Sequence, residues 1–189
     1  MISHITMNIK KVFLTSRIPL FLLISLGLIS CGSTNIAVYQ QNQPTLNVES
    51  FFKGKLTAHG IVKNRSGEVI RYFNADLKGS WDNGVGLLEE EFLFDDGELD
   101  YRTWVLTPHA DGGYVSTAND VTGSGHLQTS GNALFMKYIL QVPYKDDVIE
   151  VHVDDRMYLV KDNVLMNESI LTKFGFEVGS VSLVILKSE

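Results

Sequence analysis

Residues 69–108 read VIRYFNADLKGSWDNGVGLLEEEFLFDDGELDYRTWVLTP, and this stretch decides the fold class. Apolar and polar side chains alternate along much of it, which is the period of a half-buried β-strand. Two turn signals, Asn83-Gly84 and Asp96-Gly97, divide it into three strand-length segments. We therefore expect three antiparallel strands joined by tight hairpins.

The rest of residues 51–189 continues this pattern. No window shows a convincing helical repeat, and a short helix near residues 48–52 is the most that the sequence allows. Further turn signals are Arg65-Ser66-Gly67, Asp111-Gly112-Gly113, Thr129-Ser130-Gly131, Lys145-Asp146-Asp147 and Lys161-Asp162-Asn163. Roughly eight or more hairpin-linked strands predict an all-β domain, an antiparallel up-and-down β-barrel without exposed sheet edges. A two-sheet sandwich is the alternative.

Composition and charge exclude several classes of protein. With 44% hydrophobic residues and a single Cys, the chain is neither disordered nor a disulfide scaffold. Outside residues 1–30, 13 basic and 22 acidic residues give a net charge of −9. An acidic body without a basic stripe repels phosphate backbones, so we expect no nucleic-acid partner.

The first thirty residues have the features of an export signal. Lys10, Lys11 and Arg17 precede an uncharged, apolar run over residues 18–30. That run is shorter than the roughly 20 residues that a membrane-spanning helix needs. A basic segment, a short apolar segment and a small final residue predict a signal peptide over residues 1–30 that is removed.

The residues around the single cysteine resemble a lipidation motif. Leu28-Ile29-Ser30-Cys31 is similar to the bacterial lipobox, in which the Cys becomes the new N-terminus and carries the lipid, palmitate among its acyl chains. An unpaired thiol is otherwise disfavoured in an oxidising compartment. The resemblance implies a membrane anchor on Cys31, and Gly32 in place of Asp implies the outer membrane, facing the periplasm. Residues 31–50, polar and nearly uncharged, are predicted to form the lipidated N-terminus and a flexible tether.

The turns also predict which side chains face inward. Asn83-Gly84, Asp96-Gly97 and Asp111-Gly112 join four consecutive strands. If each is a two-residue turn, the residues that pair across these strands are fixed. The face then predicted to be exposed places Lys78 opposite Glu89, and also Glu91 opposite Arg102. Opposite charges that face each other suit a solvated face, so the other face is the interior.

That interior contains the candidate ligand site. Glu90 and Asp120 fall in one cross-strand row on either side of Thr103, with Cα atoms roughly 10 Å apart. Acids in an apolar interior cost several kcal/mol unless they are paired, so they predict either a polar cavity or a buried network. Arg71, on the same face, is one candidate for the counter-charge, and Arg156 and Lys173 are the others. The cavity candidates are Arg71, Phe73, Glu90, Phe92, Tyr101, Thr103, Tyr114 and Asp120.

An ordered set of motifs resembles a known family. The motifs are Glu90-x-Phe92-x-Phe94-x-Asp96-Gly97, Arg102-x-Trp104, Asp120-Val121-x-Gly123, Gly131-Asn132-Ala133, Asp154-Asp155-x-Met157-Tyr158 and Lys173-Phe174-Gly175. Together they look like an uncharacterised bacterial lipoprotein family, domain of unknown function 3833, which is proposed to be lipocalin-like. The resemblance covers nearly all of residues 51–189 and implies a lipocalin-like barrel in the cell envelope. It implies no established activity.

Motifs for metal binding and nucleophilic catalysis are not found. His59, His109, His126 and His152 stand without metal-ligand spacing, and there is no second Cys, so we expect surface histidines, no metal and no cofactor. Gly123-Ser124-Gly125 lacks the form of a nucleophile elbow.

Three hypotheses for function follow. The favoured one is a lipid-anchored periplasmic protein that binds a small amphipathic or lipid-like ligand in its barrel, which requires a cavity above roughly 300 Å³. The second is a structural or assembly lipoprotein with a solid barrel and an outer face that binds an envelope protein. The third, and least favoured, is a hydrolase that uses Glu90 and Asp120 as glycosidases use two carboxyls about 5–9.5 Å apart.

Overall fold

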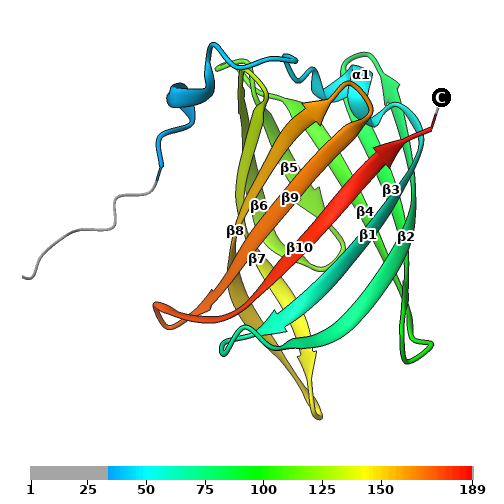
Figure 1. Ribbon diagram of the computed structural model, residues 1–189, viewed down its shortest axis with the longest axis vertical. Coiled ribbons are helices and arrows are strands. Elements are labelled where there is room, and N and C mark those ends of the chain that lie inside the picture. Colours follow the sequence, from blue (N-terminus) through cyan, green and yellow to red (C-terminus); the bar gives the residue numbers. More distant parts are fainter. Residues whose placement is uncertain (1–33, 189) are drawn as a thin grey trace, which may run out of the picture. The chain divides into compact units, whose positions relative to one another are not determined.

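The computed structural model describes residues 34–188, which form a closed barrel of ten antiparallel strands (Figure 1). Each strand pairs with the next along the chain, and β1 pairs with β10 to close the barrel. The elements are η2 (Ile36–Tyr39), α1 (Val48–Phe52), β1 (Gly54–Asn64), β2 (Val69–Asp82), β3 (Val85–Phe94), β4 (Leu99–Pro108), β5 (Tyr114–Ala118), β6 (Val121–Ser130), β7 (Ala133–Tyr144), β8 (Asp147–Lys161), β9 (Val164–Lys173) and β10 (Phe176–Lys187). The predicted up-and-down barrel is confirmed, and the two-sheet sandwich is excluded.

Helix α1 covers one end of the barrel (Figure 1). The Asn47 side chain caps it by accepting a hydrogen bond of 2.8 Å from the Ser50 N–H. Phe51 and Phe52 are each 4% exposed, so the helix packs its aromatic side chains into the barrel. A side chain at Gly79 would collide with the carbonyl of Phe52, so β2 needs a glycine where the helix approaches it. The short helix that the sequence allowed at residues 48–52 is present.

The segment before α1 lies against the barrel wall. The Tyr39 ring packs 5.8 Å from the Phe135 ring and 5.3 Å from the Tyr158 ring, and Leu46 is 4% exposed. The prediction of a flexible tether therefore does not hold for residues 34–50. Apolar side chains in this segment, such as Tyr39 and Leu46, pack against the barrel. No helix among the described residues is both long and apolar enough to span a membrane.

The β2–β3 hairpin has the predicted register. Asn83 and Gly84 both have positive φ angles, as a two-residue primed turn requires. Leu77 pairs with Glu90, and Lys78 pairs with Glu89 on the outer face. The interior parity predicted for β3 is therefore confirmed.

The β3–β4 hairpin has a loop one residue longer than predicted. The Phe94 N–H donates to the Glu98 carbonyl, and the Gly97 N–H donates to the Phe94 carbonyl, both at 3.0 Å. Gly97 has a φ of 86°, so Asp95-Asp96-Gly97 is a three-residue loop that ends with a left-handed glycine. The prediction of a two-residue turn is wrong here.

The additional loop residue shifts the register of β4 by one, so the two faces of that strand are exchanged. Glu90 pairs with Arg102 instead of Thr103, so Arg102 and Trp104 face the interior while Tyr101 and Thr103 face outward. The predicted exterior pair of Glu91 with Arg102 does not form.

The β4–β5 hairpin has the same kind of loop. The His109 N–H donates to the Gly113 carbonyl at 2.9 Å, and Gly112 has a φ of 89°. This second one-residue difference cancels the first, so β5 keeps its predicted parity and Ser116 is fully buried.

Candidate functional site

A cavity of about 190 Å³ lies inside the barrel. Every strand except β5 contributes to its lining, which is mostly aliphatic and aromatic. Phe52 of α1 closes one end, while Phe94 and the exposed Asp100 line it near the β3–β4 hairpin at the other. The volume is below the roughly 300 Å³ that the favoured hypothesis required, so a lipid-like or drug-sized ligand does not fit. The interior has room only for a smaller molecule than the sequence led us to expect.

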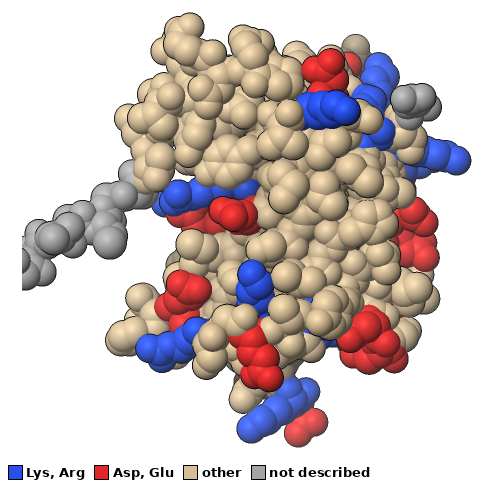
Figure 2. Space-filling model, viewed as in Figure 1, with Lys and Arg blue, Asp and Glu red and all other residues tan. Residues whose placement is uncertain are grey.

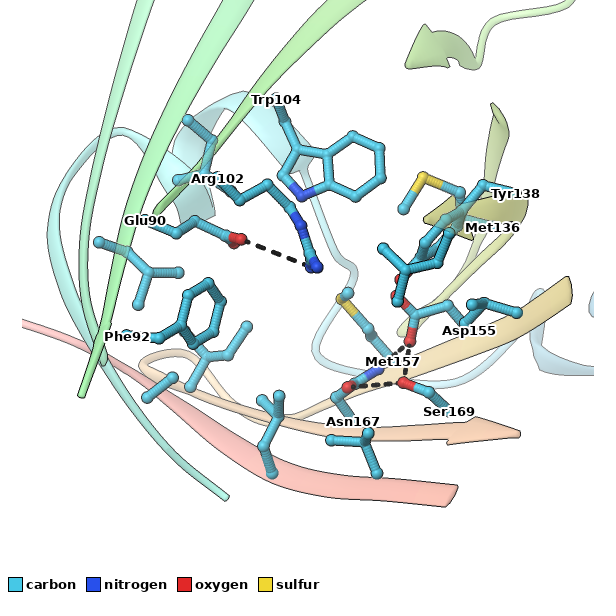
Figure 3. A pocket seen from close by; sticks show the side chains of 18 of the residues that line it. Glu90, Phe92, Arg102, Trp104, Met136, Tyr138, Asp155, Met157, Asn167 and Ser169 are labelled. Atoms are coloured by element: carbon cyan, nitrogen blue, oxygen red, sulfur yellow. Dashed lines mark hydrogen bonds and ion pairs between the residues drawn. The ribbon is translucent and has the colours of Figure 1, made fainter. Parts of the chain in front are cut away.

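An ion network occupies one wall of the interior. The Arg102 guanidinium on β4 contacts Asp120 from Nε, at 2.8 and 3.0 Å from the two carboxylate oxygens, and from an Nη at 2.6 Å. Its other Nη lies 3.9 Å from a carboxylate oxygen of Glu90 on β3 (Figure 3). The side chains of Glu90 and Arg102 are 11% and 19% exposed. Arg102 therefore neutralises Asp120 directly and Glu90 only partly.

Glu90 is an unusual carboxyl. Burial raises its pKa from 4.5 to about 7, because desolvation disfavours the charged form. The positive charge of Arg102 lowers the pKa and the negative charges of Asp155 and Asp120 raise it further, while a hydrogen bond with the Trp104 side chain lowers it. Near neutral pH, Glu90 therefore exists both as an acid that can donate and as a carboxylate that can accept.

A second polar cluster lies on the opposite wall, since β8 and β3 stand five strands apart in a ring of ten. Asp155 on β8 accepts hydrogen bonds at Oδ1 from the Asn167 amide and, at 2.7 Å, from the Ser169 hydroxyl, both on β9 (Figure 3). All three side chains are at most 6% exposed. Burial raises the pKa of Asp155, while the two hydrogen bonds lower it.

The structure places four of the predicted site residues in or beside this interior. Phe73, Glu90 and Phe92 line the cavity, and Asp120 contacts Arg102. Tyr114 is half-buried and packs against the core, but it is not among the cavity-lining residues.

Three predicted residues lie elsewhere. Tyr101 is 55% exposed and Thr103 is also on the outer face, because β4 is turned over. Arg71 does not face Glu90: it pairs with Asp96 at 3.0 Å and with Glu98 at 2.9 Å. The counter-charge of the interior is thus Arg102. Cys31, the predicted lipidation site, lies outside the described residues.

The sequence prediction missed several polar residues of the interior, among them Arg102, Trp104, Asp155, Asn167 and Ser169. A three-residue interpretation of Asp95-Asp96-Gly97 would have found the first two. Asn167 and Ser169 are two residues apart, so their side chains lie on one face of a strand. Placing them beside Asp155 would also have required the exact geometry of the turn near residues 161–163, which sets the register of the two strands.

The carboxyl pair does not have the form of a hydrolytic site. Arg102 contacts both Glu90 and Asp120 and holds the latter through three close contacts. A glycosidase instead presents two carboxyls on either side of a space that admits a sugar.

A closed antiparallel barrel with one end covered by a helix and a lined interior defines a lipocalin-like protein. The chain belongs to the family described as "Protein of unknown function (DUF3833)", whose model matches residues 25–187. The family expected from the ordered motifs is therefore confirmed.

Solved structures of other proteins share the fold. The chain is similar to an S-type phycobiliprotein lyase, CPES, from Guillardia theta, with 13% identity, a TM-score of 0.53 and coverage of 83% of this chain and 99% of that one. It is also similar to a protein of unknown function of the DUF3598 family from Nostoc punctiforme, with 13% identity, a TM-score of 0.54 and coverage of 83% and 53%. No curated protein matches the chain. At this identity the likeness concerns the fold alone.

Proposed function

We propose that the chain is a lipid-anchored lipoprotein of the bacterial cell envelope whose barrel binds a small amphipathic molecule. The cavity supports the binding role: its lining is apolar, with polar groups on opposite walls, Glu90 on β3 and Asp155 on β8. A barrel that served only as a scaffold would gain nothing from such groups, since each costs several kcal/mol when its polar atoms are not satisfied.

The charges of the interior favour one kind of polar head group. Three carboxyls, those of Glu90, Asp120 and Asp155, face a single guanidinium, that of Arg102, which Asp120 already engages. A head group that donates hydrogen bonds, such as an amine or a hydroxyl, fits this set better than a carboxylate or a phosphate. The volume of about 190 Å³ limits the apolar part to a short chain or a small ring.

Matched short-chain ligands test this proposal. We expect octylamine and octanol to change the fluorescence of Trp104, whose indole lines the cavity. Octanoate should bind about tenfold more weakly or worse, because a charge-assisted hydrogen bond to Glu90 contributes roughly 1.5–3 kcal/mol and a second carboxylate loses it. Equal binding of all three ligands would contradict the proposed chemistry of the head group.

A pair of variants on β1 provides the control. Ala58 is 2% exposed and lines the cavity, whereas Thr57 faces the outer side. Ala58→Phe fills the cavity and should abolish octylamine binding, while Thr57→Phe adds the same ring outside and should leave it unchanged. Undiminished binding in a folded Ala58→Phe variant would show that the ligand does not enter the barrel.

The anchor has an experiment of its own. The basic segment, the short apolar run and the Leu28-Ile29-Ser30-Cys31 motif support lipidation and export to the outer membrane, facing the periplasm. Mass spectrometry of the mature protein should find an acylated N-terminal Cys31, and Cys31→Ala should move the protein out of the membrane fraction. An unmodified N-terminus at Met1, or at Met7 if translation begins there, would refute the anchor and leave the binding proposal intact.

A further inference from the structure

Two histidines that stand far apart in the sequence meet on the outside of the barrel. His109 directly follows β4, and His126 lies on β6. Asp111 stands between them: its Oδ1 lies 2.9 Å from His109 Nδ1, and its Oδ2 lies 2.9 Å from His126 Nε2. One ligand atom from each of the three residues lies within 4.8 Å of the others.

The backbone holds this cluster in place. The Gly113 N–H donates to Asp111 Oδ1 at 3.0 Å, which fixes the carboxylate within its own loop. A side chain at Gly113 would collide with the Leu127 carbonyl on β6, so the glycine allows the loop to lie directly against the strand that carries His126. Two elements are thereby brought together at a contact that only glycine permits.

The cluster is open to solvent. The three side chains are 39–48% exposed, so an ion can reach them from solvent.

We propose that His109, Asp111 and His126 bind one divalent transition-metal ion, with Zn²⁺ as the reference ion. Two imidazole nitrogens and a carboxylate oxygen are ligands that Zn²⁺, Ni²⁺ and Cu²⁺ prefer, whereas Ca²⁺ and Mg²⁺ prefer oxygen alone. Zn²⁺ binds imidazole nitrogen at about 2.0–2.1 Å, so two nitrogens of one ion lie no more than roughly 4 Å apart. The ligand atoms lie within 4.8 Å of one another, so binding requires only a small rotation of an exposed ring.

Three protein ligands leave a coordination position for water or for a group from another molecule. The site faces outward from β6, because His126 is exposed there while its two neighbours on the strand, Gly125 and Leu127, are buried. It is thus separate from the cavity, and the proposal does not depend on the one made for the barrel interior.

Calorimetric titration of the untagged, metal-free full chain with ZnCl₂ in mild detergent tests the proposal. We expect uptake of one Zn²⁺ per chain, and no comparable uptake of Ca²⁺. His126→Ala and Asp111→Asn should each weaken Zn²⁺ binding by at least about tenfold, the scale on which loss of even an indirect partner acts at metal sites. His152→Ala, which removes an exposed histidine on β8, is the matched control and should bind as the wild type does.

The result is interpretable in either direction. Circular dichroism melting verifies that His126→Ala is folded, as its exposed side chain leads us to expect, and His109→Ala is the second variant should His126→Ala not fold. Absence of saturable Zn²⁺ uptake, or equal uptake by the wild type and the folded histidine variants, would show that Asp111 only joins the two rings by hydrogen bonds.

Discussion

Replacing Glu90 by Gln should change how the stability of the barrel depends on pH. The pKa of Glu90 is 4.5 in ordinary surroundings and about 7 in the folded protein. Between these values the folded state binds more protons than the unfolded state, so the free energy of unfolding falls as pH rises, and the loss is complete above pH 7. At roughly 1.36 kcal/mol per pKa unit this amounts to at most about 3 kcal/mol.

Glu90→Gln keeps the shape of the side chain and removes its charge. The variant should therefore gain stability relative to the wild type as pH rises, by up to about 3 kcal/mol more at pH 8 than at pH 4.5. Urea unfolding at several pH values, with circular dichroism as the signal, measures this difference. Glu89→Gln is the control, because Glu89 is exposed on the outer face of the same strand. A difference between the Glu90 variant and the wild type that stays constant with pH would refute the assignment of Glu90 to the desolvated interior.

Three further substitutions test the packing, each by urea unfolding. Leu165→Ala, at a fully buried core position, should cost about 2–5 kcal/mol, and a loss under 1 kcal/mol would contradict its place in the core. Gly79→Ala should destabilise the protein and make α1 accessible to protease, because its Cβ collides with the Phe52 carbonyl; unchanged protection would mean that α1 does not seal this end. Arg102→Met should cost about 3 kcal/mol or more by leaving Asp120 without its partner, and a more stable variant would show that this ion pair is dispensable.

The fold followed from the sequence because its signals are local. Alternation of apolar and polar residues between glycine-containing turns specifies strands, and Asn83-Gly84 alone fixes the pairing of Leu77 with Glu90. When enough hairpin-linked strands follow one another, the first strand can pair with the last, and the sheet closes into a barrel. The short helix at residues 48–52 shows no periodic pattern in the sequence, and its Asn47 cap became evident only in the structure.

The site was predictable only where the turn geometry was correct. Asp95-Asp96-Gly97 fits either a two-residue or a three-residue loop, and the choice decides whether Arg102 or Thr103 faces Glu90. Because parity alternates with every residue, one misplaced residue in a loop exchanges the two faces of a whole strand.

Contacts between distant segments could not be predicted. Asp155 meets its partners on β9 only because the β8–β9 hairpin sets their register, and His126 meets Asp111 because Gly113 lets a loop approach β6 closely. No local pattern in the sequence specifies these distances.

The most direct test of the central claim, that the barrel interior binds a small molecule, is native mass spectrometry of the protein after gentle extraction from its own host. The wild type should carry a non-covalent adduct of low mass, which the filled-cavity variant Ala58→Phe lacks and Thr57→Phe retains. A wild-type protein without any adduct, or the same adduct on Ala58→Phe, would contradict the claim.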